Sequence, residues 1–136
     1  MSTSQQMLAV APTFFVADVV KAAAYYEERL GFRSAKLWGK PPTFAIPTRE
    51  DLRVMLSQQD PARIHPNGVH EDTMDAYFWV RDADALHAEF KARGADIVSD
   101  PCDVDAYGMR EFAVRDPDGH VLIFAHDISS KGAANG

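Results

Sequence analysis

The sequence predicts an α+β fold built from two copies of one module, each a strand, a helix and about three further strands. Three observations lead to this fold class. A strand, an aspartate, a helical stretch and a glycine follow one another twice along the chain. The apolar runs behind each helix recur with the same internal spacing. Within the strands, side chains alternate in character, as expected where one face of a sheet packs under helices.

The first module opens with a strand ending in Phe14-Phe15-Val16-Ala17-Asp18, followed by a helical pattern up to Leu30-Gly31-Phe32. The second opens with Phe78-Trp79-Val80-Arg81-Asp82, and its helical pattern ends before Gly94. Each aspartate stands where an N-cap carboxylate accepts the free N–H groups of a first turn, and each glycine stands where a helix ends in a left-handed residue. The alternative is two unrelated helices with ordinary caps, which the shared order and spacing disfavour.

Two apolar runs follow each helix and are expected to form hairpins. They are residues 44–46 and 54–56 in the first module, and 112–114 and 122–124 in the second. In the second module, Arg115-Asp116-Pro117-Asp118-Gly119 joins them, where proline presets a turn and glycine supplies a positive φ. The equal interval between the runs predicts a turn at 47–51 in the first module.

Strand alternation separates a face that packs under the helices from an opposite face. On the first strand, Val10, Phe14 and Val16 take the helix side, which leaves Thr13 and Phe15 opposite. On the other strands the opposite face mixes aromatic, aliphatic and polar side chains: Arg53, Met55, Ser57, Asp75, Tyr77, Trp79, Val121, Ile123 and Ala125. A large apolar area with a few polar groups is typical of a small-molecule site.

We therefore expect a pocket on this face. The candidate ligand-binding residues are Phe15, Trp38, Phe44, Met55, Asp75, Tyr77, Trp79, Tyr107, Glu111 and Ile123. Trp38, Phe44, Tyr107 and Glu111 belong to middle strands or loops and are expected at the rim. The alternatives are a second core layer and a subunit interface. A sealed core is disfavoured because burying Asp75 without a partner is costly.

Length and composition indicate one domain of ordinary size. The chain has 136 residues, 46% hydrophobic and 25% charged, and no apolar run approaches the roughly 20 residues that span a bilayer. We expect residues 1–136 to form a single domain, with module 1 at about 8–60, module 2 at about 75–126 and a flexible tail at 127–136.

The net charge limits the kinds of binding partner to expect, and the cysteine content and N-terminal residues bear on the cellular compartment. The formal net charge is -6 and Lys and Arg form no cluster, so neither nucleic acid nor a membrane is expected as a partner. Cys102 is the only cysteine, which rules out an internal disulfide. Residues 1–6 have neither the basic start nor the apolar stretch of a secretory signal, so we expect a cytoplasmic protein.

Several motifs together resemble the vicinal oxygen chelate superfamily, which includes glyoxalase I, extradiol dioxygenases and bleomycin resistance proteins. They are the paired strand-Asp-helix entry with Leu30-Gly31-Phe32, the Tyr25-Tyr26 pair, and Tyr107-Gly108-Met109-Arg110-Glu111-Phe112 running into Asp116-Pro117-Asp118-Gly119-His120. The resemblance covers roughly residues 8–126. It implies two βαβββ modules forming a curved, cup-shaped eight-stranded mixed sheet with helices on the convex side, usually in a homodimer, with the ligand inside the cup.

Metal-dependent members of this superfamily bind their ion through four side chains: a His or Gln early on the first strand of each half, and a Glu on the last strand of each half. The matching positions here are Ala11, Asp75, Met55 and Ile123. Alanine, methionine and isoleucine cannot replace histidine and carboxylate ligands for a hard or borderline cation. His70-Glu71-Asp72 is assigned to a solvated loop. The resemblance therefore implies no metal, and we expect no other cofactor.

The function that the resemblance implies is that of a metal-free small-molecule binding protein, similar to the bleomycin resistance proteins, which sequesters a drug, toxin or metabolite in an aromatic cup. Asp75 or Glu111 would select a cationic or hydrogen-bonding group. One alternative is a lyase, isomerase or dioxygenase of the same superfamily, with a displaced metal site or one of these carboxylates as general base. Another is an interaction module whose aromatic face binds protein. The expected partners are a small organic ligand and a second copy of the chain in a homodimer.

Overall fold

The structure, a computed structural model, describes residues 4–33 and 36–129. It contains two α-helices, ten strands and two short 3-10 helices among these residues. Their order is β1 (Thr13–Val16), α1 (Val19–Leu30), β2 (Leu37–Trp38), β3 (Phe44–Ala45), β4 (Thr48–Arg49), β5 (Leu52–Arg53), β6 (Met55–Gln58), η1 (Pro61–Arg63), η2 (Asn67–Val69), β7 (Ala76–Trp79), α2 (Ala83–Ala92), β8 (Asp96–Val104), β9 (Met109–Arg115) and β10 (Val121–Asp127). The predicted α+β fold class is confirmed.

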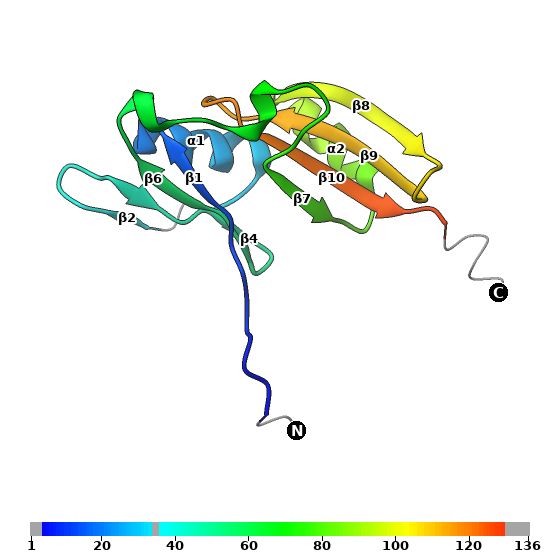
Figure 1. The fold of residues 1–136 in the computed structure, drawn as a ribbon, viewed down its shortest axis with the longest axis horizontal. Helices are drawn as coiled ribbons and strands as arrows, with labels where there is room; N and C mark the ends of the chain where they lie inside the picture. Colours follow the sequence, from blue (N-terminus) through cyan, green and yellow to red (C-terminus); the bar gives the residue numbers. More distant parts are fainter. Residues whose placement is uncertain (1–3, 34–35, 130–136) are drawn as a thin grey trace.

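The two predicted modules form two four-stranded sheets, which lie beside each other in Figure 1. The first has the order β1-β6-β3-β2 and the second β7-β10-β9-β8. In each, the opening strand of the module pairs in parallel with its last strand, and the remaining pairs are antiparallel. The eight strands are thus divided between two hydrogen-bonded sheets, and β4 and β5 form a small additional hairpin.

Both helices begin at the aspartates predicted from the sequence. The Asp18 carboxylate accepts a hydrogen bond from the N–H of Lys21 at 3.1 Å, and that of Asp82 accepts one from Ala85 at 3.0 Å. Helix α1 ends at Gly31, whose φ of 70° is left-handed as predicted. Helix α2 ends at Ala92 with Arg93 as its C-cap, and the left-handed glycine follows at Gly94, with a φ of 81°.

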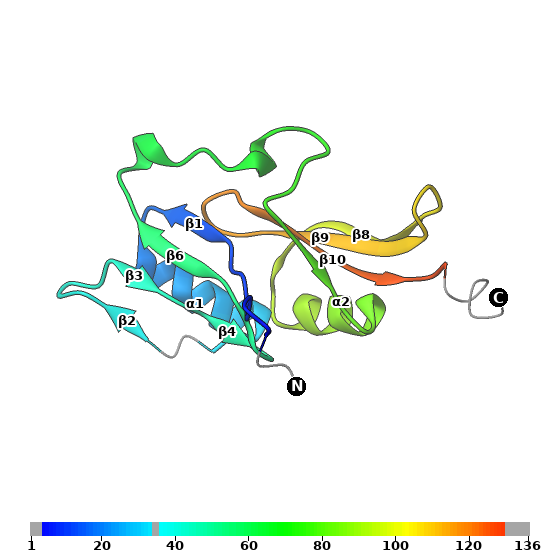
Figure 2. The ribbon, with the colours of Figure 1, turned by 60° about the horizontal axis from the view of Figure 1, so that its bottom comes forward.

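The helices cover one face of the two sheets, as Figure 2 shows. One continuous core contains residues from both modules. Its largest fully buried side chains include Tyr26 and Leu30 of α1 and Phe90 of α2, with Leu56, Phe112 and Leu122 on the strands. Fully burying a Leu or Phe side chain stabilises a fold by roughly 1.5–3 kcal/mol. The core therefore joins the modules as well as each helix to its own sheet.

The two modules meet at two corresponding seams. At the first seam, the Tyr26 hydroxyl of α1 donates to the Asp116 carboxylate of the β9–β10 turn at 2.9 Å. At the second seam, Arg49 of the β4–β5 hairpin donates two hydrogen bonds to Glu89 of α2. In each seam, a hairpin of one module packs against the helix of the other.

The predicted turns lie at these seams. In the second module, the Asp116 N–H donates to the His120 carbonyl at 2.9 Å, and Gly119 has a φ of 95°. In the first module, where a turn was predicted at 47–51, Thr48 and Arg49 form β4. The turn itself is at Glu50 and Asp51, which adopt positive φ values of 50° and 72°. Two non-glycine residues therefore take the left-handed backbone that glycine supplies in the second module.

The N-terminal segment before β1 extends away from the body of the molecule (Figure 1). We call residues 5–12 the N-terminal arm. Met7, Leu8 and Val10 are 89%, 84% and 93% exposed. The expectation that Val10 packs on the helix side is wrong, because β1 begins only at Thr13.

At the C-terminus, residues 130–136 of the expected flexible tail lie outside the described residues. Of the preceding three, Asp127 ends β10, and the N–H groups of Ile128 and Ser129 donate to the Gly108 carbonyl. No helix in the described part of the chain has the length and apolar character needed to cross a membrane.

Candidate ligand-binding site

The sheet of the second module carries a patch of aromatic and acidic side chains. Strand register places Tyr77 beside Ile123, and Trp79 beside Ala125, which in turn is opposite Glu111. Because side chains alternate along each strand, these residues share the face opposite the core residues Phe78, Phe112, Leu122 and Phe124. We call the residues Tyr77, Trp79, Glu111 and Ile123, together with Tyr107, the second-sheet face. All five were candidate ligand-binding residues.

Tyr77 and Glu111 form the polar centre of the second-sheet face. The Tyr77 hydroxyl donates to Oε2 of Glu111 at 2.6 Å. Desolvation raises the pKa of Tyr77 strongly, and the hydrogen bond to Glu111 and the charge of its carboxylate add to this effect. Tyr77 therefore remains a neutral hydrogen-bond donor at physiological pH. A carboxylate has about four lone-pair sites, so Glu111 keeps acceptor capacity beyond its bond from Tyr77.

Aromatic rings surround this polar pair. The ring centroids of Tyr77 and Trp79 lie 4.9 Å apart, and 73% of Trp79 is exposed. Tyr107, in the β8–β9 turn, is 57% exposed, and desolvation followed by a hydrogen bond to Glu111 raises its pKa. The described residues thus place a large exposed aromatic area next to one carboxylate.

The remaining aromatic candidates lie on the other sheet. Thr13 pairs with Met55, and Ser57 lies between Phe15 and Phe44, so Phe15, Phe44 and Met55 share the face opposite the core. Trp38 pairs with Phe44, with ring centroids 5.6 Å apart. We call the residues Phe15, Trp38, Phe44 and Met55 the first-sheet face. Because the two sheets lie beside each other, the structure divides the candidates between two faces.

Asp75 is engaged by the backbone of its own module. Its Oδ1 accepts the N–H of Asn67 at 2.7 Å, and its Oδ2 accepts those of Gly68 at 3.0 Å and Val121 at 2.8 Å. These bonds tie the η2 loop to the beginning of β10. Both oxygens of Asp75 therefore serve the fold, whereas the sequence suggested that this carboxylate would select a ligand.

The residues at the family's metal positions do not fit a metal ion. Ala11 and Ile123 have no donor atom, and Met55 offers a thioether, which is a poor ligand for hard or borderline cations. Both Asp75 oxygens are occupied by backbone N–H groups. In the described part of the chain, no three His, Cys, Asp or Glu side chains come together in a way that could hold an ion.

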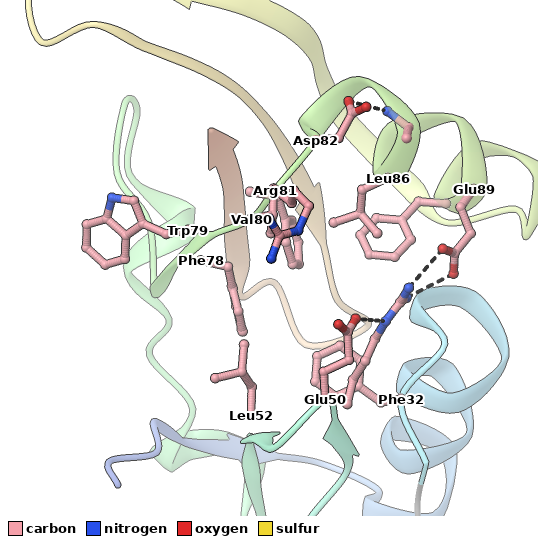
Figure 3. Close-up of a pocket in the computed structure, with 14 residues that line it drawn as sticks. Phe32, Glu50, Leu52, Phe78, Trp79, Val80, Arg81, Asp82, Leu86 and Glu89 are labelled. Atoms are coloured by element: carbon pink, nitrogen blue, oxygen red, sulfur yellow. Dashed lines mark hydrogen bonds and ion pairs between the residues drawn. The ribbon is translucent and has the colours of Figure 1, made fainter. Parts of the chain in front are cut away.

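A pocket of about 510 Å³ opens at the second seam (Figure 3). Phe32, Phe78, Phe90, Leu52 and Leu86 form its apolar walls, while its charged groups are Arg49, Glu50, Arg81, Asp82 and Glu89. Figure 3 shows Trp79 apart from the other side chains of this pocket. The pocket was not predicted, because its walls come from an inter-module contact between segments about 40 residues apart, such as Arg49 and Glu89.

Comparison with known proteins agrees with this architecture. The model of the Glyoxalase/Bleomycin resistance protein/Dioxygenase superfamily matches residues 8–124. No curated protein matches the chain. Among solved structures, the bleomycin-binding protein from bleomycin-producing Streptomyces verticillus, in complex with copper(II)-bleomycin, is 28% identical with a TM-score of 0.66; the alignment covers 88% of this chain and 96% of that one.

Two further solved structures share the fold at lower identity. TioX from Micromonospora sp. ML1 is 23% identical, with a TM-score of 0.69 and coverage of 89% of this chain and 99% of that one. A glyoxalase/bleomycin resistance protein/dioxygenase from Alicyclobacillus acidocaldarius is 18% identical, with a TM-score of 0.74 and coverage of 90% and 92%.

Proposed function

The chain belongs to the glyoxalase/bleomycin resistance protein/dioxygenase superfamily, and on this basis we propose that it is a metal-free protein that binds and sequesters a small organic molecule. The observation that carries the proposal is the second-sheet face, where Trp79 is 73% exposed beside Tyr77 and Glu111. An exposed indole next to a carboxylate gives a guest both stacking area and one directed polar contact.

The expected ligand is an aromatic or heteroaromatic molecule that carries a cationic or hydrogen-bond-donating group. The rings of Tyr77, Trp79 and Tyr107 supply apolar contact, and Glu111 offers an acceptor next to them. The 28% identical Streptomyces verticillus protein, whose structure holds copper(II)-bleomycin, supports a ligand of this kind. The net charge of -6 also favours a cation over an anion.

We propose further that the working form is a homodimer, in which the first-sheet face of one copy covers the second-sheet face of another. Both faces carry exposed aromatic rings, Trp38 at 41% and Trp79 at 73%. β1 and β7 are edge strands of their sheets, and the N-terminal arm exposes Met7, Leu8 and Val10. An exposed apolar segment beside an open strand edge is a ready partner for strand addition by a second copy.

The binding proposal is tested by titrating a panel of cationic aromatic compounds, with metal-free bleomycin as one member, by calorimetry. We expect Trp79→Ala to weaken binding about tenfold, because an aromatic or cation–π contact with an indole contributes roughly 0.5–2 kcal/mol. Val20→Ala, at a 49% exposed site on α1, is the matched control and should leave affinity unchanged. Glu111→Gln should lower the affinity for cationic compounds more than the affinity for neutral ones.

Two results would contradict the binding proposal. One is a panel in which no compound binds to the wild-type protein. The other is a compound whose affinity changes with neither Trp79→Ala nor Glu111→Gln.

The dimer is tested separately by sedimentation equilibrium of the full chain. We expect a dimer at micromolar concentration and a monomer for Val10→Glu, and a monomeric wild type would contradict it.

A further inference from the structure

A second pocket, of about 470 Å³, lies at the first seam between β1 and the β9–β10 turn. Pro12, Phe15 and Pro66 line it with apolar surface. Its polar lining consists of Thr13, Arg63, His65, Asn67, Asp75 and His120. Among the residues of the second-sheet face, none lines this pocket. It is therefore distinct from the site at Trp79 and Glu111, and it borders the first-sheet face at Phe15.

His120 is a buried imidazole held in one orientation. Only 4% of the residue is exposed. Its ring stacks on Phe14, with centroids 4.4 Å apart and planes within 12°. Its Nδ1 lies 2.8 Å from Oδ2 of Asp116, which is itself only 3% exposed. Stacking and the Asp116 contact together fix where the second ring nitrogen, Nε2, points.

The partners of Asp116 determine which nitrogen of His120 carries the proton. The Asp116 carboxylate accepts the backbone N–H groups of Asp118 and His120 and the hydroxyl of Tyr26. A carboxylate receiving these donors acts as an acceptor, so Nδ1 of His120 carries the proton that it shares with Asp116. In the neutral imidazole, Nε2 is then a bare acceptor.

Nε2 has no hydrogen-bond partner among the described residues. In the same part of the chain, no fully buried side-chain nitrogen or oxygen lacks a partner. Nε2 is therefore accessible, and the open space next to this residue is the second pocket. The pocket thus contains a directed acceptor that the fold itself does not use.

The corresponding position in the first module shows that the repeat does not require a histidine here. The hairpin correspondence pairs Val54 with Leu122, and hence Leu52 with His120. Leu52 lines the pocket at the second seam beside Phe78, the counterpart of Phe14 (Figure 3). The two seams therefore carry pockets of similar construction. At the corresponding position, the pocket of the second seam has the apolar Leu52 and that of the first seam has the imidazole of His120.

We propose that the second pocket is a binding site for a small, planar, neutral molecule that donates an O–H, such as a phenol, to Nε2 of His120. The ring of Phe15 and the two prolines supply the apolar walls for a planar guest. The guanidinium of Arg63, 5.3 Å above the Phe15 ring, lies at the same pocket and is a donor. The Asp75 carboxylate already accepts three backbone N–H groups, and His65 is exposed, so His120 is the buried, directed acceptor. A buried acceptor favours a guest that carries a donor over one that lacks it.

The test uses phenol and anisole, which share a ring but differ in the hydrogen-bond donor. Binding is followed by NMR of the histidine ring nitrogens in the full-length protein. We expect phenol to shift the Nε2 signal of His120 and to bind roughly fivefold more tightly than anisole, within the range for one neutral hydrogen bond. The signals of His87 and His70, outside the pocket, should not move.

His120→Asn provides the matched variant, because the asparagine N–H can still donate to Asp116 while the Nε2 acceptor is lost. We expect it to retain the fold and to lose the preference for phenol over anisole, whereas Trp79→Ala should keep that preference. An unshifted Nε2 signal in the wild type at saturating phenol would overturn the proposal, even if the variant fails to fold. The proposal would also be overturned if a folded His120→Asn variant kept the wild-type preference for phenol over anisole.

Discussion

Arg49 and Glu89 face each other across the second seam through two parallel hydrogen bonds, Nη1 to Oε2 and Nη2 to Oε1, both 2.9 Å long. Nη1 also donates to the Leu30 carbonyl at the end of α1 at 2.9 Å, and Arg93 donates to the same Glu89. One guanidinium thus joins the β4–β5 hairpin to both helices. Bidentate pairs of this kind are stronger and more directional than single contacts.

Arg49→Lys is expected to lower the free energy of unfolding by about 1 kcal/mol, because an ammonium cannot reproduce the paired geometry. Urea unfolding at pH 7 measures the change, and Arg53→Lys on the exposed neighbouring strand should have little effect. Hydrogen bonding from Arg49 is the largest cause that lowers the pKa of Glu89. The stabilisation is therefore present at neutral pH and is lost as the pH falls below the ordinary pKa of a glutamate and through the lowered pKa of Glu89. A wild type and an Arg49→Lys variant with equal acid sensitivity would contradict this account.

Tyr26→Phe is expected to cost about 1–2 kcal/mol, because it removes a donor from the buried Asp116 carboxylate. Burial, followed by the charge of Asp116, raises the pKa of Tyr26 well above its ordinary value. Above about pH 10 the unfolded chain releases this proton while the folded protein keeps it, so wild-type stability falls as pH rises. Urea unfolding between pH 8 and 11 should show a shallower fall in Tyr26→Phe. An identical alkaline slope in both proteins would show that Tyr26 does not control it.

Asp75→Asn is expected to destabilise the protein by about 2 kcal/mol, because one amide oxygen cannot accept the three N–H groups that the carboxylate holds. Thermal unfolding measures the loss, with Asp105→Asn on the exposed β8–β9 turn as control. Ligand affinity, corrected for the folded fraction, should be unchanged. If the Asp75→Asn protein were as stable as the wild type but bound the ligand more weakly, Asp75 would be a ligand-binding residue and not a structural one.

Added Zn²⁺, Ni²⁺, Fe²⁺ or Mn²⁺ is expected to leave the melting temperature unchanged, because three of the four family metal positions are Ala11, Met55 and Ile123. A metal that binds only the folded state, at 100 times its dissociation constant, adds about 2.7 kcal/mol. Differential scanning calorimetry would detect such a gain. Stoichiometric metal in the purified protein would favour the enzyme alternative over sequestration.

The parts of the fold that could be predicted depend on residues close together in the sequence. Asp18 and Asp82 cap helices because an N-cap needs only the N–H groups two or three residues ahead. The β9–β10 hairpin follows from the Pro and Gly between its strands. Alternation along β7 separates Phe78 from Tyr77 and Trp79 because successive side chains point to opposite faces.

The parts that could not be predicted depend on contacts between distant segments. Asp75 looked like a ligand group because the N–H of Val121, 46 residues away, is not visible in its local sequence. The Tyr26–Asp116 contact joins residues 90 positions apart. The division of the candidate site between two faces has the same origin, since each strand shows which way its side chains point but not where the other sheet lies.

The two seams differ in chemistry, so different solution conditions weaken them. The Tyr26–Asp116 seam is shielded from solvent and is weakened by alkali, whereas the Arg49–Glu89 seam is partly exposed and is weakened by acid and by salt. Because one continuous core joins the modules, loss of the Arg49–Glu89 pair would loosen the β4–β5 hairpin without separating the two halves. Cleavage by a protease in mild acid would then begin at the β4–β5 hairpin, while the β9–β10 turn stayed protected.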